Sequence, residues 1–288
     1  MHKSKATIPM LAATGLLLVI GSAQAEIIYG LTSDNTLFNF DSATPNDIDN
    51  GAFITGLNAT ETVIGIDFRP SNGQLYGLTN QNRIFTIGTT PSVNFGTATF
   101  VSTLSAPLNG TSFGIDFNPV PNLLRVISDA DQNLRVNVDT GATTVDGPIT
   151  YGTNVNPNIV GAAYSNNVAG ATSTTLYTID SFLNQLNTQN PPNNGTQVPV
   201  GSLTVDTTNL VGFDISGVTG TAYASLQPAG GGFSQLYSIN LVNGIAQNAN
   251  VIGGGLFVRD ISVMIPEPAT LGLAALAAAG LVARRRRA

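Results

Sequence analysis

The chain of 288 residues contains no cysteine, no tryptophan and one histidine, His2. Between residues 26 and 267 it also contains no lysine. A Ser-His-Asp or Cys-His relay requires an imidazole, the common zinc sites use His and Cys ligands, and Schiff-base and P-loop chemistry require a lysine. The sequence therefore excludes these classes of chemistry from the central segment. The absence of cysteine also excludes disulfides, so the stability of the fold must come from a packed core.

Basic residues are scarce in the same segment. Residues 26–267 hold five arginines against all 17 acidic residues of the chain, which gives a net charge of −12. Binding to nucleic acid depends mainly on neutralising phosphates with Lys and Arg. We therefore expect no nucleic-acid partner.

The N-terminus has the features of a signal peptide. A basic start is followed by an apolar run over residues 11–20 and then by Ala23 and Ala25 with one residue between them. This small-x-small pattern predicts that signal peptidase cleaves after Ala25, so that residues 1–25 are removed. The alternative is a membrane-spanning helix, but the apolar run is shorter than the roughly 20 residues that a span needs.

The C-terminus carries a second apolar segment, over residues 269–283, with distinctive flanks. The segment is preceded by Pro266, Glu267 and Pro268 and followed by Arg284, Arg285, Arg286 and Arg287. This order resembles the PEP-CTERM sorting signal of Gram-negative bacteria. A GPI signal normally lacks the basic end, and a simple tail anchor would leave the body on the same side of the membrane.

The resemblance to PEP-CTERM implies a route and partners for residues 265–288. It implies transient insertion of the C-terminal helix in the inner membrane, removal of the tail by an exosortase, and a link to exopolysaccharide and biofilm. We therefore expect the body to reach the outer envelope surface or the extracellular matrix, where polysaccharide is a candidate partner.

Short segments repeat along the central part of the chain at nearly equal intervals. Four begin with glycine, at Gly65, Gly114, Gly161 and Gly212, and a fifth begins at Asp260. The steps between them are 49, 47, 51 and 48 residues. Apolar, β-branched runs broken by turn residues are typical of strands. Units of about 40 to 50 residues with up to four strands are typical of β-propeller blades.

A second strand follows most of these segments, as at residues 75–79 and 124–128, and the N-terminal strand at 28–32 matches it without a preceding first strand. We therefore predict an all-β propeller over residues 26–264. Its five blades are predicted near residues 27–60, 61–110, 111–158, 159–208 and 209–256. Segment 258–263 is predicted to supply the first strand of blade one and so to remove free sheet edges. An irregular β-sandwich or a solenoid is the alternative.

The body is also similar to a family of secreted bacterial proteins known as domain of unknown function 4394. The similarity is clearest over residues 114–148, 161–180, 189–196 and 212–215 and covers nearly all of 27–264. It implies a fold and an export route, and it implies no activity.

One candidate metal site lies in a predicted hairpin loop of blade three. Asp129, Asp131 and Asn133 offer oxygen ligands at alternate positions, a spacing that suits Ca²⁺. Leu134 occupies the place of the EF-hand glycine, and Thr140 occupies the place of the final glutamate. The alternative is a polar turn in which the side chains bond their own backbone. No other cofactor is predicted.

Asp67, Asp116 and Asp214 recur at one position of the predicted innermost strands, where the other two repeats have Ala163 and Ser262. A ring of carboxylates in the channel of a propeller is a candidate site for a cation or a sugar. The alternative is structural, with each Asp accepting a hydrogen bond from the backbone of the neighbouring blade. Convergence of the three would raise the pKa of at least one of them.

Two main functions remain open. The first is a non-enzymatic propeller module that binds polysaccharide, protein or Ca²⁺, and we favour it because most catalytic side chains are absent. The second is a hydrolase or lyase that uses aspartates, with or without Ca²⁺, on matrix sugars or lactones. A purely structural matrix component is a third possibility.

Overall fold

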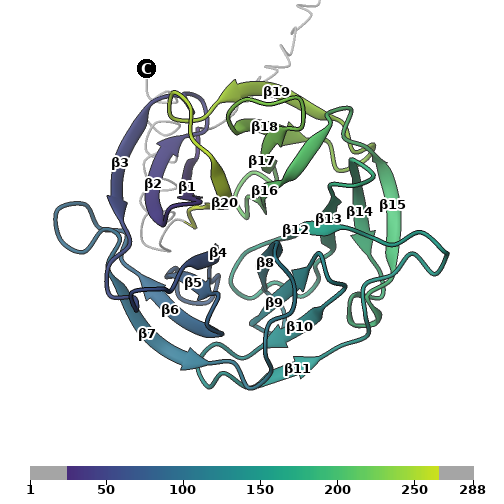
Figure 1. The fold of residues 1–288 in the computed structure, drawn as a ribbon, viewed down its shortest axis with the longest axis horizontal. Helices are drawn as coiled ribbons and strands as arrows, with labels where there is room; N and C mark the ends of the chain where they lie inside the picture. The colour runs from purple at the N-terminus through teal and green to yellow at the C-terminus, as the bar shows by residue number, and fades with distance from the viewer. Residues whose placement is uncertain (1–24, 266–288) are drawn as a thin grey trace, which may run out of the picture.

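The computed structural model of the protein describes residues 25–265 and shows five sheets arranged around a central axis (Figure 1). Each sheet has four strands, and every pairing between neighbouring strands is antiparallel. The predicted five-bladed β-propeller is confirmed. In every blade the strands follow one another from the axis outwards.

Blade one contains, in this order, β20 (Val258–Val263), β1 (Ile27–Thr32), β2 (Thr36–Asp41) and β3 (Ile48–Phe53). Blade two contains β4 (Val63–Phe68), β5 (Leu75–Thr79), β6 (Arg83–Ile87) and β7 (Ala98–Thr103). Blade three contains β8 (Phe113–Asn118), β9 (Leu123–Ser128), β10 (Asn133–Val136) and β11 (Thr143–Val145). Blade four contains β12 (Ile159–Tyr164), β13 (Leu176–Asp180), β14 (Gln185–Gln189) and β15 (Gln197–Ser202). Blade five contains β16 (Thr207–Ile215), β17 (Ala222–Pro228), β18 (Gln235–Ile239) and β19 (Ala246–Val251).

The ring is closed by the last strand. β20 pairs with β1, with Ile28 opposite Val263 and Gly30 opposite Ile261. The first and last strands of the propeller in sequence therefore share one sheet. This is the closure predicted from the repeat that has no first strand. All strands of the described part of the chain lie between Ile27 and Val263, so segment 26–265 contains the five blades.

Burial falls from the axis to the rim of each blade. All six residues of β4 and of β12 are buried, whereas β3 and β19 are mostly exposed. Large side chains fill the space between blades: Tyr76 of blade two meets Phe117 of blade three with ring centroids 5.3 Å apart. Tyr29 meets Phe68 across the next interface at 5.2 Å. The core is therefore a set of layers between blades, and each blade depends on its neighbours.

The repeat glycines allow the innermost strands to approach one another closely. A Cβ atom on Gly114 would lie 2.6 Å from the backbone nitrogen of Ala162 in the next blade, and one on Gly212 would lie 2.5 Å from the nitrogen of Ile261. A contact this short with backbone cannot be relieved by turning a side chain. Gly114 and Gly212 therefore mark points where two inner strands touch, whereas a Cβ on Gly65 or Gly161 would first meet side chains.

Helical structure is limited to one short 3₁₀ turn over Pro192–Asn194 within the described part of the chain. Among residues 25–265, no helix is long and apolar enough to cross a membrane.

Removal of β20 is expected to open the ring. This strand buries Val258, Ile261 and Val263, and burial of each such side chain contributes about 1.5–3 kcal/mol. Against a total stability of roughly 5–15 kcal/mol, we expect segment 26–257 to lose at least half of its free energy of unfolding. Circular dichroism melts of segments 26–257 and 26–263 measure the difference. Equal midpoints would contradict closure by β20.

Substitution of a contact glycine is expected to push two inner strands apart. We expect Gly114→Ala to lower the free energy of unfolding by about 1–3 kcal/mol or more, as other overpacked cores do. Gly230→Ala is the matched control, because a Cβ there meets nothing within 4 Å. Chemical denaturation of the two variants tests this, and equal stability would contradict the close approach.

Candidate functional site

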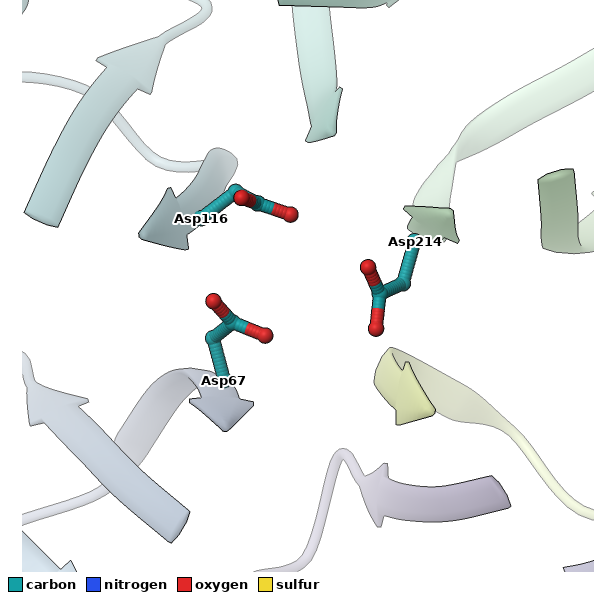
Figure 2. A group of neighbouring side chains, drawn as sticks. All are labelled: Asp67, Asp116 and Asp214. Carbon is teal, nitrogen blue, oxygen red and sulfur yellow. The ribbon is translucent and has the colours of Figure 1, made fainter. Parts of the chain in front are cut away.

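Three carboxylates converge on the axis of the propeller. Asp67 on β4, Asp116 on β8 and Asp214 on β16 point towards one another from three blades (Figure 2). One oxygen from each lies within 4.8 Å of the others. The three residues are only 1%, 1% and 2% exposed. The corresponding positions of the other two inner strands hold Ala163 and Ser262, as the repeat register indicates.

Asp67 and Asp214 hold neighbouring blades together. Asp67 Oδ2 accepts the backbone N–H of Phe117 at 2.7 Å, and Asp214 Oδ2 accepts that of Val263 at 2.6 Å. The Ser262 hydroxyl lies between the two, 2.8 Å from Asp67 Oδ1 and 3.2 Å from Asp214 Oδ2. These contacts are those of the structural alternative, in which a register Asp binds the backbone of the next blade.

Asp116 differs from both. Neither of its carboxylate oxygens is exposed, and neither has a hydrogen-bond partner among the described residues. Its neighbours around the axis explain this. On one side Asp67 can only accept when ionised, and on the other side Ala163 has no polar group. The backbone N–H of Tyr164, the counterpart of the N–H groups that Asp67 and Asp214 accept, offsets part of the rise that burial causes in the pKa of Asp116, but it makes no well-formed hydrogen bond to this carboxylate.

A fourth carboxylate, Asp260, lies in the same channel and was not predicted as a site residue. Its Oδ2 accepts the backbone N–H of Ile66 at 2.8 Å, and its Oδ1 accepts that of Ile261 at 2.9 Å. The available signal was that Asp260 stands where the other four repeats have glycine.

Burial dominates the electrostatics of this cluster. Loss of solvation raises the pKa of Asp67, Asp116 and Asp260 well above the ordinary value, and the neighbouring carboxylates raise those pKa values further. Burial also raises the pKa of Asp214, to about 6, against the backbone N–H donors that lower it. No arginine forms an ion pair with these groups among the described residues.

The hairpin residues Asp129, Asp131 and Asn133 do not share a common centre, and each has different surroundings. Asp129 accepts hydrogen bonds from the backbone and hydroxyl of Thr111 and the backbone of Ser112. The amide of Asn133 turns into the blade, where its oxygen accepts a hydrogen bond from an arginine at 2.7 Å. Asp131 adopts a positive φ of 60°, and its Oδ1 is buried without a partner. These contacts are typical of the polar turn that was the alternative to a calcium loop.

That arginine, Arg125, is the largest fully buried side chain, at 1% exposure. Its guanidinium contacts the Tyr164 hydroxyl at 3.1 Å, Asp146 at 2.7 Å and Asn193 at 2.8 Å. Asp146 supplies the carboxylate partner of Arg125 inside the interface between blades three and four. All three guanidinium nitrogens are satisfied, so this group is a structural link.

A surface groove of about 300 Å³ lies where blade one meets blade five. It is lined by uncharged residues: Ala25, Ser42, Ala43, Thr219, Thr221, Tyr223, Leu236, Tyr237, Ser238, Asn248 and Asn250. Beside it the Glu26 carboxylate accepts hydrogen bonds from the hydroxyls of Ser216, Thr219 and Tyr223. Sequence reasoning missed this groove because its residues come from five separate segments.

The remaining predicted residues lie at the ends of the chain. Ala25, the last residue of the predicted signal peptide, forms part of the groove wall. Ala23 and the predicted sorting residues 266–268 and 284–287 lie outside the described residues.

The channel carboxylates are expected to make the metal-free protein less stable as the pH rises. An unfolded aspartate loses its proton near pH 3.9, whereas the raised pKa values keep protons on the folded cluster, to about pH 6 at Asp214. The folded state therefore binds more protons between pH 4 and 7, and its stability falls as the pH increases through this window. Arginines lower the pKa values of Asp139 and Asp146. These two groups therefore stabilise the folded state above about pH 4, and their contribution is lost as the pH falls below that value.

Melts of segment 26–265 in EDTA between pH 4.5 and 7 test this, with an expected fall of about 5 °C or more in the midpoint. Asp116→Asn removes one charge from the cluster, so we expect it to flatten the decline and raise the midpoint at pH 7. A wild-type midpoint that rises with pH would contradict the repulsion.

Solved structures resemble the fold at low identity. A chain of the crystal structure of a nidogen/laminin complex matches with a TM-score of 0.50 at 10% identity, over 84% of this chain and 99% of that one. A protein of unknown function from Bacteroides thetaiotaomicron VPI-5482 matches with a TM-score of 0.48 at 14% identity, over 84% of this chain and 65% of that one. At such identities the first match shows a shared fold alone. No curated protein matches the chain significantly.

Two family models account for nearly all of the chain beyond the N-terminus. The PEP-CTERM protein-sorting motif matches residues 265–287, which confirms the predicted sorting signal and implies export, membrane anchoring and processing by an exosortase. The second model matches residues 36–262 and so covers most of the propeller. The chain therefore belongs to the family described as domain of unknown function (DUF4394).

Proposed function

We propose that this protein is a non-enzymatic β-propeller module that binds neutral polysaccharide at the outer envelope surface or in the extracellular matrix. The sorting motif brings the chain to an exosortase, and the resemblance to PEP-CTERM proteins links that route to exopolysaccharide and biofilm. An acidic body with uncharged hydroxyl and amide side chains on its surface suits such a setting.

The observation that carries the proposal is the groove between blades one and five. Sugars are bound by hydroxyl and amide groups together with aromatic rings, in concave sites. The groove offers Asn248 and Asn250 from β19, Thr221 and Ser42 from the neighbouring loops, and Tyr223 from β17. No charged side chain lines the groove, so its wall favours a neutral polymer over an acidic one. After cleavage at Ala25 the charges at its edge are the α-amino group of Glu26, which faces Ser42, and the Glu26 carboxylate.

Burial of the channel carboxylates favours binding over catalysis. A glycosidase places two carboxyl groups on either side of a bond in its substrate. Asp67, Asp116 and Asp214 are sealed at 1–2% exposure between the inner strands. A sugar ring cannot reach these groups without separation of the blades.

We expect saturable binding of segment 26–265 to the water-insoluble exopolysaccharide fraction of the producing bacterium, with no release of soluble sugar. Loss of a hydrogen-bonding amide costs about 1 kcal/mol, so Asn250→Ala should weaken the affinity by about fivefold. Co-sedimentation at increasing polysaccharide concentration measures the affinity, and a reducing-end assay on the supernatant measures turnover.

Asn154→Ala is the matched control, since this exposed amide lies between β11 and β12, away from the groove. It should bind as the wild type does. Equal binding by Asn250→Ala and the wild type would exclude the groove. Release of reducing ends that is lost in Asp67→Asn would replace this proposal with the aspartate-based hydrolase or lyase.

A further inference from the structure

We propose that the central channel holds one calcium ion between the carboxylates of Asp67, Asp116 and Asp214. This inference goes beyond the proposed function, because a cation in the channel and a sugar in the peripheral groove occupy different parts of the molecule. Either one can fail without the other.

The first argument is the unsatisfied carboxylate of Asp116. Burial of a polar group without a partner is costly, and burial of a charge is more so. The two neighbouring register positions explain the difference from the other aspartates. Ser262 lies between Asp214 and Asp67 and offers them a hydroxyl, whereas Asp116 lies between Asp67 and Ala163. Apart from the nearby backbone N–H of Tyr164, which makes no well-formed hydrogen bond, no protein group donates to Asp116, so its oxygens can bind an added ligand.

The second argument is the charge of the channel. With Asp260 included, four carboxylates come from strands that line the axis, all buried. The four ion pairs among the described residues use other acids, namely Asp139, Glu61 and Asp146. Arg259, adjacent to Asp260 in sequence, turns to the backbone oxygen of Ser33 at 3.3 Å. Within the described part of the chain no cationic side chain forms an ion pair with the cluster, and Arg259 offsets only part of the charge of Asp260, so a bound cation can supply the remaining compensation.

The third argument is size. Three oxygens that lie within 4.8 Å of one another can all lie within about 2.8 Å of a single point, close to the 2.3–2.6 Å of Ca²⁺–oxygen contacts. Mg²⁺ requires metal–oxygen distances of about 2.0–2.1 Å and strict octahedral geometry. The inner strands that carry the three aspartates would therefore have to move closer together to bind Mg²⁺ than to bind Ca²⁺. Calcium takes six to eight oxygens and accepts bidentate carboxylates. Asp116 can bind through both oxygens, and water or Ser262 Oγ can complete the shell.

A proton is the competing occupant of the same place. A protonated Asp116 carboxyl can donate a hydrogen bond to Asp214, and this would also relieve repulsion within the cluster. The two arrangements differ in their dependence on added metal. A cation raises the stability of the folded state by RT ln(1 + c/Kd), where c is its free concentration, and this gain grows with the logarithm of the concentration above Kd, whereas a proton makes the cluster indifferent to calcium.

The test is a metal analysis followed by melts of purified segment 26–265. We expect mass spectrometry of the protein, purified without chelator, to find about one calcium per chain, which EDTA removes. At pH 7, calcium at a hundredfold excess over Kd should raise the midpoint of the EDTA-treated protein by about 5–10 °C. Magnesium at the same concentration should raise it less.

Three variants locate the site. Asp116→Asn should lose the calcium shift while melting above the wild type in EDTA, so that loss of the site is distinguished from failure to fold. Asp49→Asn, a charge removed from the exposed edge strand β3, should keep the full shift. Asp129→Asn should keep it as well. No bound metal together with no shift in the wild type would show that protons occupy the cluster and would overturn the proposal. A shift that survives in Asp116→Asn, or is lost in Asp129→Asn, would overturn it by placing the ion elsewhere.

Discussion

Close contact between the innermost strands is the constraint on which the rest of this molecule depends. At Gly114 and Gly212 the backbone of the next blade lies so near that a single Cβ atom would overlap it. Two residues further along the same strands, a side chain that points to the axis is then within reach of the next blade's backbone N–H. Asp67 and Asp214 use this reach to bond Phe117 and Val263. In blade five, Gly212 and Asp214 are therefore two parts of one contact.

The contact is not repeated equally around the ring. Ala163 interrupts the series of polar side chains in blade four, and Asp260 replaces the glycine in blade one. The Ser262 hydroxyl lies within hydrogen-bonding distance of two aspartates, whereas Asp116 has no hydroxyl beside it and makes no well-formed bond to the nearby backbone N–H of Tyr164. In a perfectly symmetric ring all carboxylates would have the same surroundings, so either every one would be hydrogen-bonded or every one would be repelled by its neighbours. The asymmetry concentrates the unsatisfied charge at one side of the channel.

The architecture was readable from the sequence because it is periodic. Spacing of the glycine segments predicted five blades, and the missing first strand before Ile28 predicted closure by 258–263. The same register predicted that three aspartates share one strand position. It could not predict that Asp116 lacks a well-formed hydrogen bond, because hydrogen bonding depends on which residues of adjacent blades meet, and these are about 50 residues apart. Burial of Arg125 was missed for a similar reason, since its partners Asp146 and Asn193 come from outside its own hairpin.

Closure of the ring and occupation of the channel are coupled by the same geometry. Asp67, Asp116 and Asp214 belong to blades two, three and five, and Ser262 belongs to the strand that closes blade one. These groups meet only when β20 has paired with β1. A cation that binds the closed ring and not the open chain stabilises closure, and closure strengthens cation binding by the same factor. In its absence, repulsion among the carboxylates opposes the approach of the inner strands that the glycines permit. The acidic channel therefore makes the strength of closure depend on what occupies it.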